Sequence, residues 1–138
     1  MIKEIIKDTE FLTQKSDAFV FGKDDYLIND LIDTAEANKD RCLGLASIQI
    51  GVPKKIILVR KGDKFILLIN PLIIHKSTKT YIAKESCLSL EGTRTVKRHR
   101  AIKIIYADIT GKKKAENIDG LLAQIIQHEC DHLKGVLI

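Results

Sequence analysis

The chain of 138 residues is long enough to bury a hydrophobic core without disulfides and too short for two ordinary domains, so one domain over residues 1–138 is expected. Its 45% hydrophobic and 30% charged residues, with only two prolines, exclude a disordered or fibrous protein. The net charge of +5 would favour an anionic surface such as ribosomal RNA, but scattered basic residues and 5% aromatic content argue against sequence-specific nucleic-acid binding.

An amphipathic helix over residues 24–38 is the first element that the pattern predicts. Apolar residues recur there at helical spacing, and Asp24 or Asp25 stands where an N-terminal cap is expected. One face of this helix should therefore pack on the core. A glycine-punctuated connection over residues 44–51 follows it.

The middle of the chain has the composition of a β-sheet. Runs of aliphatic residues are separated by turn residues, and Asn70 with Pro71 interrupts the pattern between the second run and the third. We expect strands over residues 56–60, 65–69, 72–75 and 102–109. The first two should form a hairpin around a turn at residues 61–63.

A second helix is expected at the C-terminal end. From Asp119 onward apolar residues return to helical spacing, and Gly135 marks the expected end of the helix. Helix, sheet and helix in this order predict an α+β domain.

This last helix carries the most informative motif, His128-Glu129-Cys130-Asp131-His132. Two histidines four positions apart project from one face of a helix and can hold one metal ion. The glutamate beside the first histidine can take a proton from water and return it to a leaving group, as metal-assisted hydrolysis requires. Both histidines continue the apolar stripe of the helix, and buried imidazoles need polar partners. The motif therefore predicts a catalytic metal site.

The third metal ligand must come from upstream of this motif. Zinc proteases with the same motif take it from a downstream glutamate or histidine, but residues 133–138 contain no ligating side chain. Cys87 is the best upstream candidate, because a thiolate binds soft and borderline metals strongly. His75 and His99 are expected to be surface or strand residues.

The cysteines and the start of the chain bear on the cellular compartment. The three cysteines, Cys42, Cys87 and Cys130, show no CxxC spacing, so a secreted disulfide framework is not expected. Cys130 lies off the histidine face and should be structural, whereas Cys42 has no evident partner. No signal peptide is recognisable, and no apolar run reaches the roughly 18 residues of a membrane span. We expect a cytoplasmic protein without membrane contact.

Three segments, in this order and spacing, resemble the signature motifs of the peptide deformylase family. Gly44-Leu-Ala-Ser-Ile-Gln49 is similar to the first motif, Glu85-Ser-Cys-Leu-Ser89 to the second, and Gln127-His-Glu-Cys-Asp-His132 to the third. The resemblance implies the fold of this family, with small mixed or antiparallel sheets packed around a C-terminal metal-binding helix. It also implies hydrolysis of the N-formyl group from the N-terminal formyl-methionine of nascent polypeptides, with release of formate.

The resemblance further implies a metal centre with a defined set of groups. One divalent ion, natively ferrous iron and replaceable by zinc, nickel or cobalt, would be held by three ligands: Cys87, His128 and His132. Glu129 would carry the proton to the departing amine. The side-chain amide of Gln49 and the backbone N–H of Leu88 would stabilise the oxyanion, and such donors contribute roughly 3 kcal/mol each in comparable hydrolases.

In this family the substrate lies beside the first two motifs like an added strand, and its methionine side chain enters an apolar pocket. The positions that match these contacts are Leu43, Gly44, Ser86, Leu121, Gln124 and Ile125. Arg94 follows at the family's spacing and is a further candidate substrate contact. Glu85 and Arg98 are expected to form an ion pair, and Asp131 to support the metal ligands. Few residues follow the metal helix, so any transient ribosome contact should use the positive body of the protein.

Three positions depart from the family pattern. Ser47 stands where a second alanine is usual, and Ser86 stands where glycine is usual. If the backbone at Ser86 needed a positive φ, serine would cost about 1 kcal/mol or more, and if φ is negative it would cost little. Gln124 is also more polar than the residue often found there, which leaves the side-chain preference of the pocket open.

Three other interpretations remain at this point. A paralogue of the family could keep the metal site but have weak or altered activity. A zinc endopeptidase would need a downstream ligand, which the chain lacks. A basic nucleic-acid-binding module with a structural metal would need a fourth protein ligand, and Glu129 would then have no role.

Overall fold

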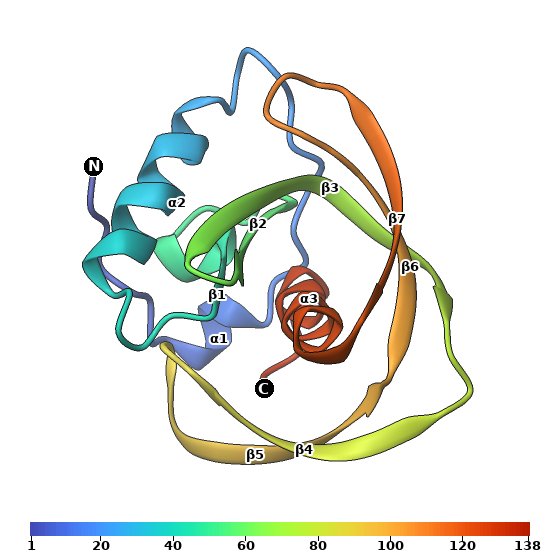
Figure 1. The fold of residues 1–138 in the computed structure, drawn as a ribbon. Coiled ribbons are helices and arrows are strands. Elements are labelled where there is room, and N and C mark those ends of the chain that lie inside the picture. Colours follow the sequence, from blue (N-terminus) through green and yellow to red (C-terminus); the bar gives the residue numbers. More distant parts are fainter.

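The computed structural model describes all residues from Met1 to Ile138. The helices are α1 (Thr9–Leu12), α2 (Tyr26–Ala37), the short 3-10 helix η1 (Ser47–Ile50) and α3 (Gly120–Leu133). The strands are β1 (Gly44–Ala46), β2 (Ile56–Lys61), β3 (Lys64–Lys76), β4 (Thr80–Cys87), β5 (Leu90–His99), β6 (Ala101–Ala107) and β7 (Lys113–Asp119). Figure 1 shows α3 nearly end-on at the centre, with strands curving around it and α2 on the far side of β1 and β2.

The strands form two antiparallel sheets. A five-stranded sheet has the order β1-β2-β3-β6-β7, and β4 pairs with β5 in a separate two-stranded sheet that passes across the other side of α3 (Figure 1). The expected α+β fold, with sheets packed around the C-terminal helix, is therefore confirmed. None of the helices has the length and hydrophobicity required to cross a bilayer.

Strand β2 lies between two hydrophobic clusters. Ile57 and Val59 belong to the cluster that packs against α3, and Ile56 and Leu58 belong to the cluster beneath α2. All four side chains are fully buried, which explains why the sequence of β2 is continuously apolar rather than alternating. Each such burial contributes roughly 1.5–3 kcal/mol. This double-sided core holds α3 in place against the sheet.

The predicted hairpin and the two long helices are confirmed. Strands β2 and β3 pair with Lys61 opposite Lys64, and α2 and α3 occupy the expected segments. Asp25, one of the two predicted candidates, is the N-cap residue of α2, but neither aspartate accepts a hydrogen bond from the first turn. Asp24 accepts from the N–H of Val20 and Asp25 from that of Gly22, so both carboxylates stabilise the preceding turn.

The expected break at Asn70 and Pro71 is wrong, because β3 continues through it as a bulge. Asn70 adopts a positive φ of 50°, and its side chain exchanges two hydrogen bonds with the backbone of Phe19, at 2.8 and 3.1 Å. The contact with Phe19 thus stabilises a bulge at a position where the local sequence predicts the end of a strand. Residues 72–75 are the second half of β3 rather than a separate strand.

Three strands were not anticipated: β4, β5 and β7. Their sequences are rich in charged residues, and few of their side chains are buried. Glu85 of β4 and Arg98 of β5 are buried as an ion pair, so the inward face of these strands is partly polar and the usual alternation of apolar residues is weakened.

Candidate metal centre

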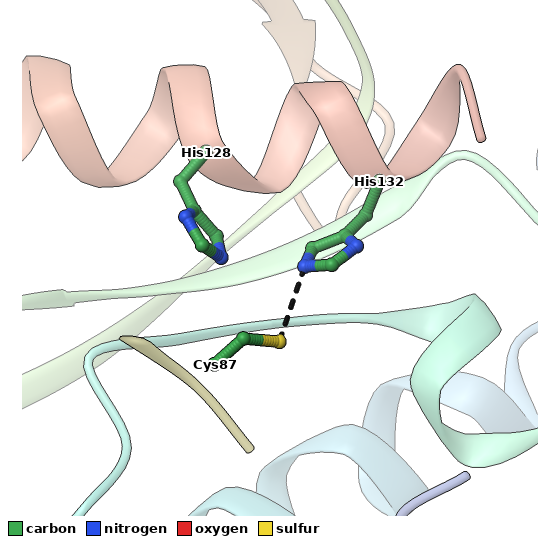
Figure 2. Close-up of side chains that lie close together, drawn as sticks. All are labelled: Cys87, His128 and His132. Carbon is green, nitrogen blue, oxygen red and sulfur yellow. Dashed lines mark hydrogen bonds between the residues drawn. The ribbon is translucent and has the colours of Figure 1, made fainter. Parts of the chain in front are cut away.

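Three side chains that are distant in sequence meet on one side of α3. His128 and His132 project from successive turns of the helix, and Cys87 approaches them from the end of β4 (Figure 2). One ligand atom of each lies within 4.8 Å of the others, and Sγ of Cys87 is 3.4 Å from Nε2 of His132. Two ligands of a tetrahedral site, with metal bonds of 2.1–2.3 Å, lie about 3.6 Å apart. The three donors therefore fit one divalent ion.

The orientation of His128 is fixed by a buried carboxylate. Its Nδ1 lies 2.8 Å from Oε1 of Glu85, which leaves Nε2 free for a ligand. Glu85 also accepts hydrogen bonds from Nη2 and Nε of Arg98, at 2.6 and 2.9 Å, so the expected ion pair is confirmed. Burial opposes the charge of Glu85, but the hydrogen bonds from Arg98 and His128 prevail and lower its pKa to about 2.

The same network continues to the far end of α3. Nη1 of Arg98 donates to Oδ2 of Asp131 at 2.6 Å, so one guanidinium joins β4, β5 and the metal helix. Asp131 is linked to His128 only indirectly, through Arg98 and Glu85. A carboxylate that holds the second nitrogen of a ligating histidine fixes its tautomer and ring orientation.

The pKa values of the two histidines are shifted in opposite directions by burial and neighbouring groups. Burial disfavours the charged form of His128, but its hydrogen bonds with Cys87 and Glu85 raise the pKa to about 10. Burial and repulsion from His128 lower the pKa of His132 to about 3. Nδ1 of His132 is buried and has no hydrogen-bond partner. His132 is therefore a neutral imidazole, the form that binds a metal.

Glu129 is packed against the backbone of β1. The carboxylate is almost fully buried, and its Oε1 has no hydrogen-bond partner. Burial raises the pKa of Glu129 to about 7, although the charge of His128 opposes this. A Cβ on Gly44 would lie 2.6 Å from Oε2 of Glu129, so only glycine leaves room for this carboxylate.

Gln49 contacts the thiol of Cys87. Its Oε1 accepts the N–H of Ala46 at 2.9 Å, and its Nε2 donates to Sγ of Cys87 at 3.2 Å and to Oγ of Ser89 at 3.1 Å. The backbone N–H of Ser89 also approaches the sulfur, at 3.5 Å. Two N–H donors thus face Sγ of Cys87.

A pocket of about 150 Å³ opens beside this centre. Among the residues that line it are Cys87, His128 and Glu129, together with seven of the positions predicted from the family motifs: Leu43, Gly44, Ser86, Leu88, Leu121, Gln124 and Ile125. The structure therefore brings together the predicted metal ligands, the glutamate and nearly all of the predicted substrate contacts.

Arg94 is the predicted contact that does not line this pocket. Its Nη1 donates to the carbonyl of Glu91, and its Nε and Nη2 are buried without a partner. Its position on β5, opposite Glu85 of β4, keeps the side chain beside the centre rather than inside the pocket.

Sequence reasoning missed four residues around the pocket. Arg41 and Lys84 line it and form no ion pair within 4 Å. Tyr81 donates its hydroxyl to Oε1 of Gln124 at 2.8 Å and so fixes the polar side chain in the pocket wall. Ser89, which holds Gln49, is the last residue of the second motif and could have been singled out there.

The two serine departures have local explanations. Ser47 is fully buried, and its hydroxyl donates to the carbonyl of Val52 at 2.6 Å, so the extra polar group is satisfied. Ser86 is exposed on β4 and has a negative φ. The strained alternative for Ser86 is thus excluded, and serine fits this strand at little cost.

The remaining cysteines and histidines lie outside the cluster. Cys42 and Cys130 are buried free thiols in the two hydrophobic clusters, and burial raises the pKa of each to about 12. His75 is exposed on β3, and His99 on β5 contacts the carbonyl of Ser77, as expected for strand residues.

Comparisons with known proteins agree with this geometry. The family described as polypeptide deformylase matches residues 2–138. A peptide deformylase of Clostridium beijerinckii is 46% identical over 138 residues, which cover all of both chains. A second, from Pelagibacter ubique, is 43% identical over 80% of this chain and 67% of its own.

Solved structures show the same fold. The peptide deformylase of Thermotoga maritima superimposes with a TM-score of 0.89 at 30% identity, over 99% of this chain and 95% of its own. A probable peptide deformylase of Synechococcus phage S-SSM7 gives 0.89 at 32% identity, over 98% and 96%. The chain belongs to the polypeptide deformylase family of enzymes, which remove the N-formyl group from nascent peptides.

Proposed function

We propose that this chain is a metal-dependent hydrolase that removes the formyl group from N-terminal formyl-methionine. The observation that carries the proposal is the position of Glu129, which lines the pocket with Cys87 and His128 and has a buried carboxylate oxygen without a hydrogen-bond partner. A structural metal site would have no use for such a group, and no fourth protein ligand joins the three donors.

We assign the metal to Cys87, His128 and His132. A divalent ion bound there would polarise the formyl carbonyl and lower the pKa of a water molecule. One thiolate and two imidazoles suit ferrous iron as well as zinc, nickel or cobalt. Ferrous iron is our choice for the native ion, by analogy with the family.

Glu129 is the proton carrier in this scheme. It takes a proton from the water whose oxygen forms the new bond to the formyl carbon, and it returns that proton to the nitrogen as the C–N bond breaks. Formate and a free N-terminal amine are the products. The wall formed by Gly44 keeps the carboxylate at one position, so little reorganisation is needed between the two transfers.

The side chain of Gln49 and the N–H of Leu88 are assigned to the oxyanion that develops on the formyl oxygen. The Nε2 group of Gln49 already lies within 3.2 Å of Cys87, next to the centre, and Leu88 lines the pocket. Preorganised donors of this kind stabilise a developing negative charge without moving.

The substrate's methionine side chain is expected to enter beside α3. Leu121 and Ile125 supply apolar wall there, and the Gln124 side chain is held by Tyr81. The substrate backbone would run along Leu43, Gly44 and Ser86, at the edges of β1 and β4. Arg94 would contact the substrate only after its side chain reorients.

The biological partner would be the N-terminus of a nascent polypeptide in the cytoplasm. Any transient contact with the ribosome would use the exposed lysines and arginines of the body, since the chain has a net charge of +5. No sequence-specific contact with nucleic acid and no membrane contact is part of this proposal.

The test is formate release from a formyl-methionyl peptide by protein purified without oxygen and loaded with ferrous iron or nickel. Glu129→Ala is the matched control, because it keeps all three metal ligands. Turnover that is lost in the control while metal content stays the same supports the proposal. Bound metal without turnover, even in Ser86→Gly, would favour a family member with weak or altered activity.

A further inference from the structure

A second pocket lies behind the metal helix, on the side away from the catalytic pocket. It has a volume of about 330 Å³, within the roughly 300–1,000 Å³ range of small-molecule sites. We call it the lysine pocket. Its lining residues are Lys15, Ser16, Lys55, Pro71, Leu72, Ile73, Lys76, Cys130, Leu133 and Lys134.

The charge of this pocket is strongly one-sided. Its four lysines come from four separate segments, and no carboxylate lines it. None of Lys15, Lys55, Lys76 and Lys134 forms an ion pair within 4 Å. All four lysines are exposed, so solvent screens part of their mutual repulsion, and an anion bound between them would relieve the remainder.

The pocket also contains an unsatisfied polar group. Ser16 is 5% exposed, and its Oγ is buried without a hydrogen-bond partner, which destabilises the folded protein. By rotation of the Ser16 side chain, this hydroxyl would reach a ligand oxygen in the pocket, an acceptor that the protein does not supply. The hydroxyl thus points independently to an oxygen-rich ligand.

The walls of the pocket are tied together by backbone hydrogen bonds. The N–H of Ser16 donates to the carbonyl of Leu133 at 2.9 Å, and the N–H of Asn70 donates to the carbonyl of Lys55 at 2.8 Å. The loop after α1, the start of β2, the middle of β3 and the end of α3 are therefore held in fixed relation. The site is preformed, which reduces the entropy lost on binding.

A purely structural explanation accounts for only part of this arrangement. The C-terminal end of α3 carries partial negative charge and attracts a cation, which explains Lys134. It does not explain the lysines of the other three segments, nor the unpartnered serine beside them.

We propose that the lysine pocket binds a phosphate group, either as the free anion or as a small phosphate ester. Lysine ammonium groups are compact, charged hydrogen-bond donors to phosphate, and the hydroxyl of Ser16 adds a neutral donor. The ester is the source we expect, because Pro71, Leu72 and Leu133 place apolar surface beside the charges. This site is separate from the proposed deformylation, and neither depends on the other.

The test is calorimetric titration of the full-length, metal-loaded protein with inorganic phosphate and with phenyl phosphate at low ionic strength. Lys55→Gln/Lys76→Gln should raise the Kd by about tenfold or more, because two charge-assisted hydrogen bonds to the phosphate are lost. Lys64→Gln/Lys113→Gln removes the same charge from exposed strand lysines outside the pocket and should change the Kd less than about twofold. Ser16→Ala should weaken binding by a few fold.

The outcomes separate the sources and the alternatives. Tighter binding of phenyl phosphate identifies an ester site, and equal binding identifies a site for the free anion; both support the proposal. Equal weakening in the two double variants, or no saturable binding of either probe at millimolar concentration, would overturn it. Formate release and thermal unfolding of each variant show that it is folded. If the double variant does not fold, Ser16→Ala and the single variants Lys55→Gln and Lys76→Gln carry the test.

Discussion

Gly44 and Glu129 are in direct steric contact, although 85 positions separate them in sequence (129 − 44). A Cβ at position 44 would approach Oε2, Cγ and Cδ of Glu129 to between 2.6 and 3.0 Å. Seven of the eight glycines have a positive φ, and Gly44 is the exception. Close approach of the carboxylate, rather than backbone conformation, is therefore what requires glycine here.

Gly44→Ala should therefore reduce activity by displacing Glu129. We expect kcat to fall by roughly a hundredfold, since misplacement of a catalytic group by about 1 Å has effects of this size. Formate release at saturating peptide measures it, with bound metal as the control. Thermal unfolding of the two single variants and the double variant gives a double-mutant cycle. Gly44→Ala should lower the unfolding temperature of the wild-type protein but have little effect in the Glu129→Ala background, where the clash is absent. Equal destabilisation in both backgrounds would contradict the steric explanation.

Glu85→Gln should weaken metal binding. The amide cannot hold both Arg98 and Nδ1 of His128 as the carboxylate does, so the imidazole loses its fixed orientation. A loss of about 10–100-fold in metal affinity is expected, measured by competition with a chelator. Glu91→Gln, an exposed carboxylate on β5, is the matched control and should leave the affinity unchanged.

Gln49→Ala should reduce kcat by roughly 10²–10³-fold, the effect of removing one preorganised donor in comparable hydrolases. Ser89→Ala removes only the hydroxyl that positions the amide, so its effect should be smaller. Rates and unfolding temperatures are compared for both variants. The assignment fails if Ser89→Ala is as damaging as Gln49→Ala at equal stability.

Arg41 and Lys84 should favour substrates with acidic residues after the methionine. Both line the catalytic pocket and neither is paired, so they can attract a carboxylate at the second or third position. Exposed pairs contribute about 0.2–1 kcal/mol each, which predicts a combined preference of up to about thirtyfold in kcat/KM. Arg41→Gln/Lys84→Gln should lose it while its kcat/KM for neutral peptides stays the same.

Salt provides the control for this preference. The advantage of acidic peptides should shrink as ionic strength rises, because exposed charges are screened over about 10 Å at 0.1 M salt. An advantage that persists at high salt would assign it to another contact.

Tyr106 should make the protein less stable at alkaline pH. Burial and the hydrogen bond to Glu116 raise the pKa of Tyr106 to about 12, above the usual value of about 10. The resulting stabilisation is present below pH 10 and is lost as the pH rises through 12. Between these values Tyr106 loses its proton in the unfolded chain but keeps it in the folded protein. Urea unfolding between these values, compared with Tyr106→Phe, tests this. In Tyr106→Phe, the free energy of unfolding should fall less steeply with pH over this range.

Sequence alone was sufficient where the physical signal is local. The spacing of His128 and His132 fixes both imidazoles on one face, because helical geometry repeats every 3.6 residues. The apolar run of β2 and the periodicity of α2 likewise identified buried elements. Motif order in the chain was enough to indicate the family.

Only the tertiary structure decided which distant groups meet. The sequence named Cys87 as the best candidate for the third donor, but its approach to the two histidines depends on how β4 crosses α3. The sequence also does not reveal that Gly44 accommodates Glu129, or that four lysines lie around one pocket behind α3. Strands β4 and β5 were missed since they pack on polar partners. These features depend on long-range packing and charge, which periodicity in a single sequence does not record.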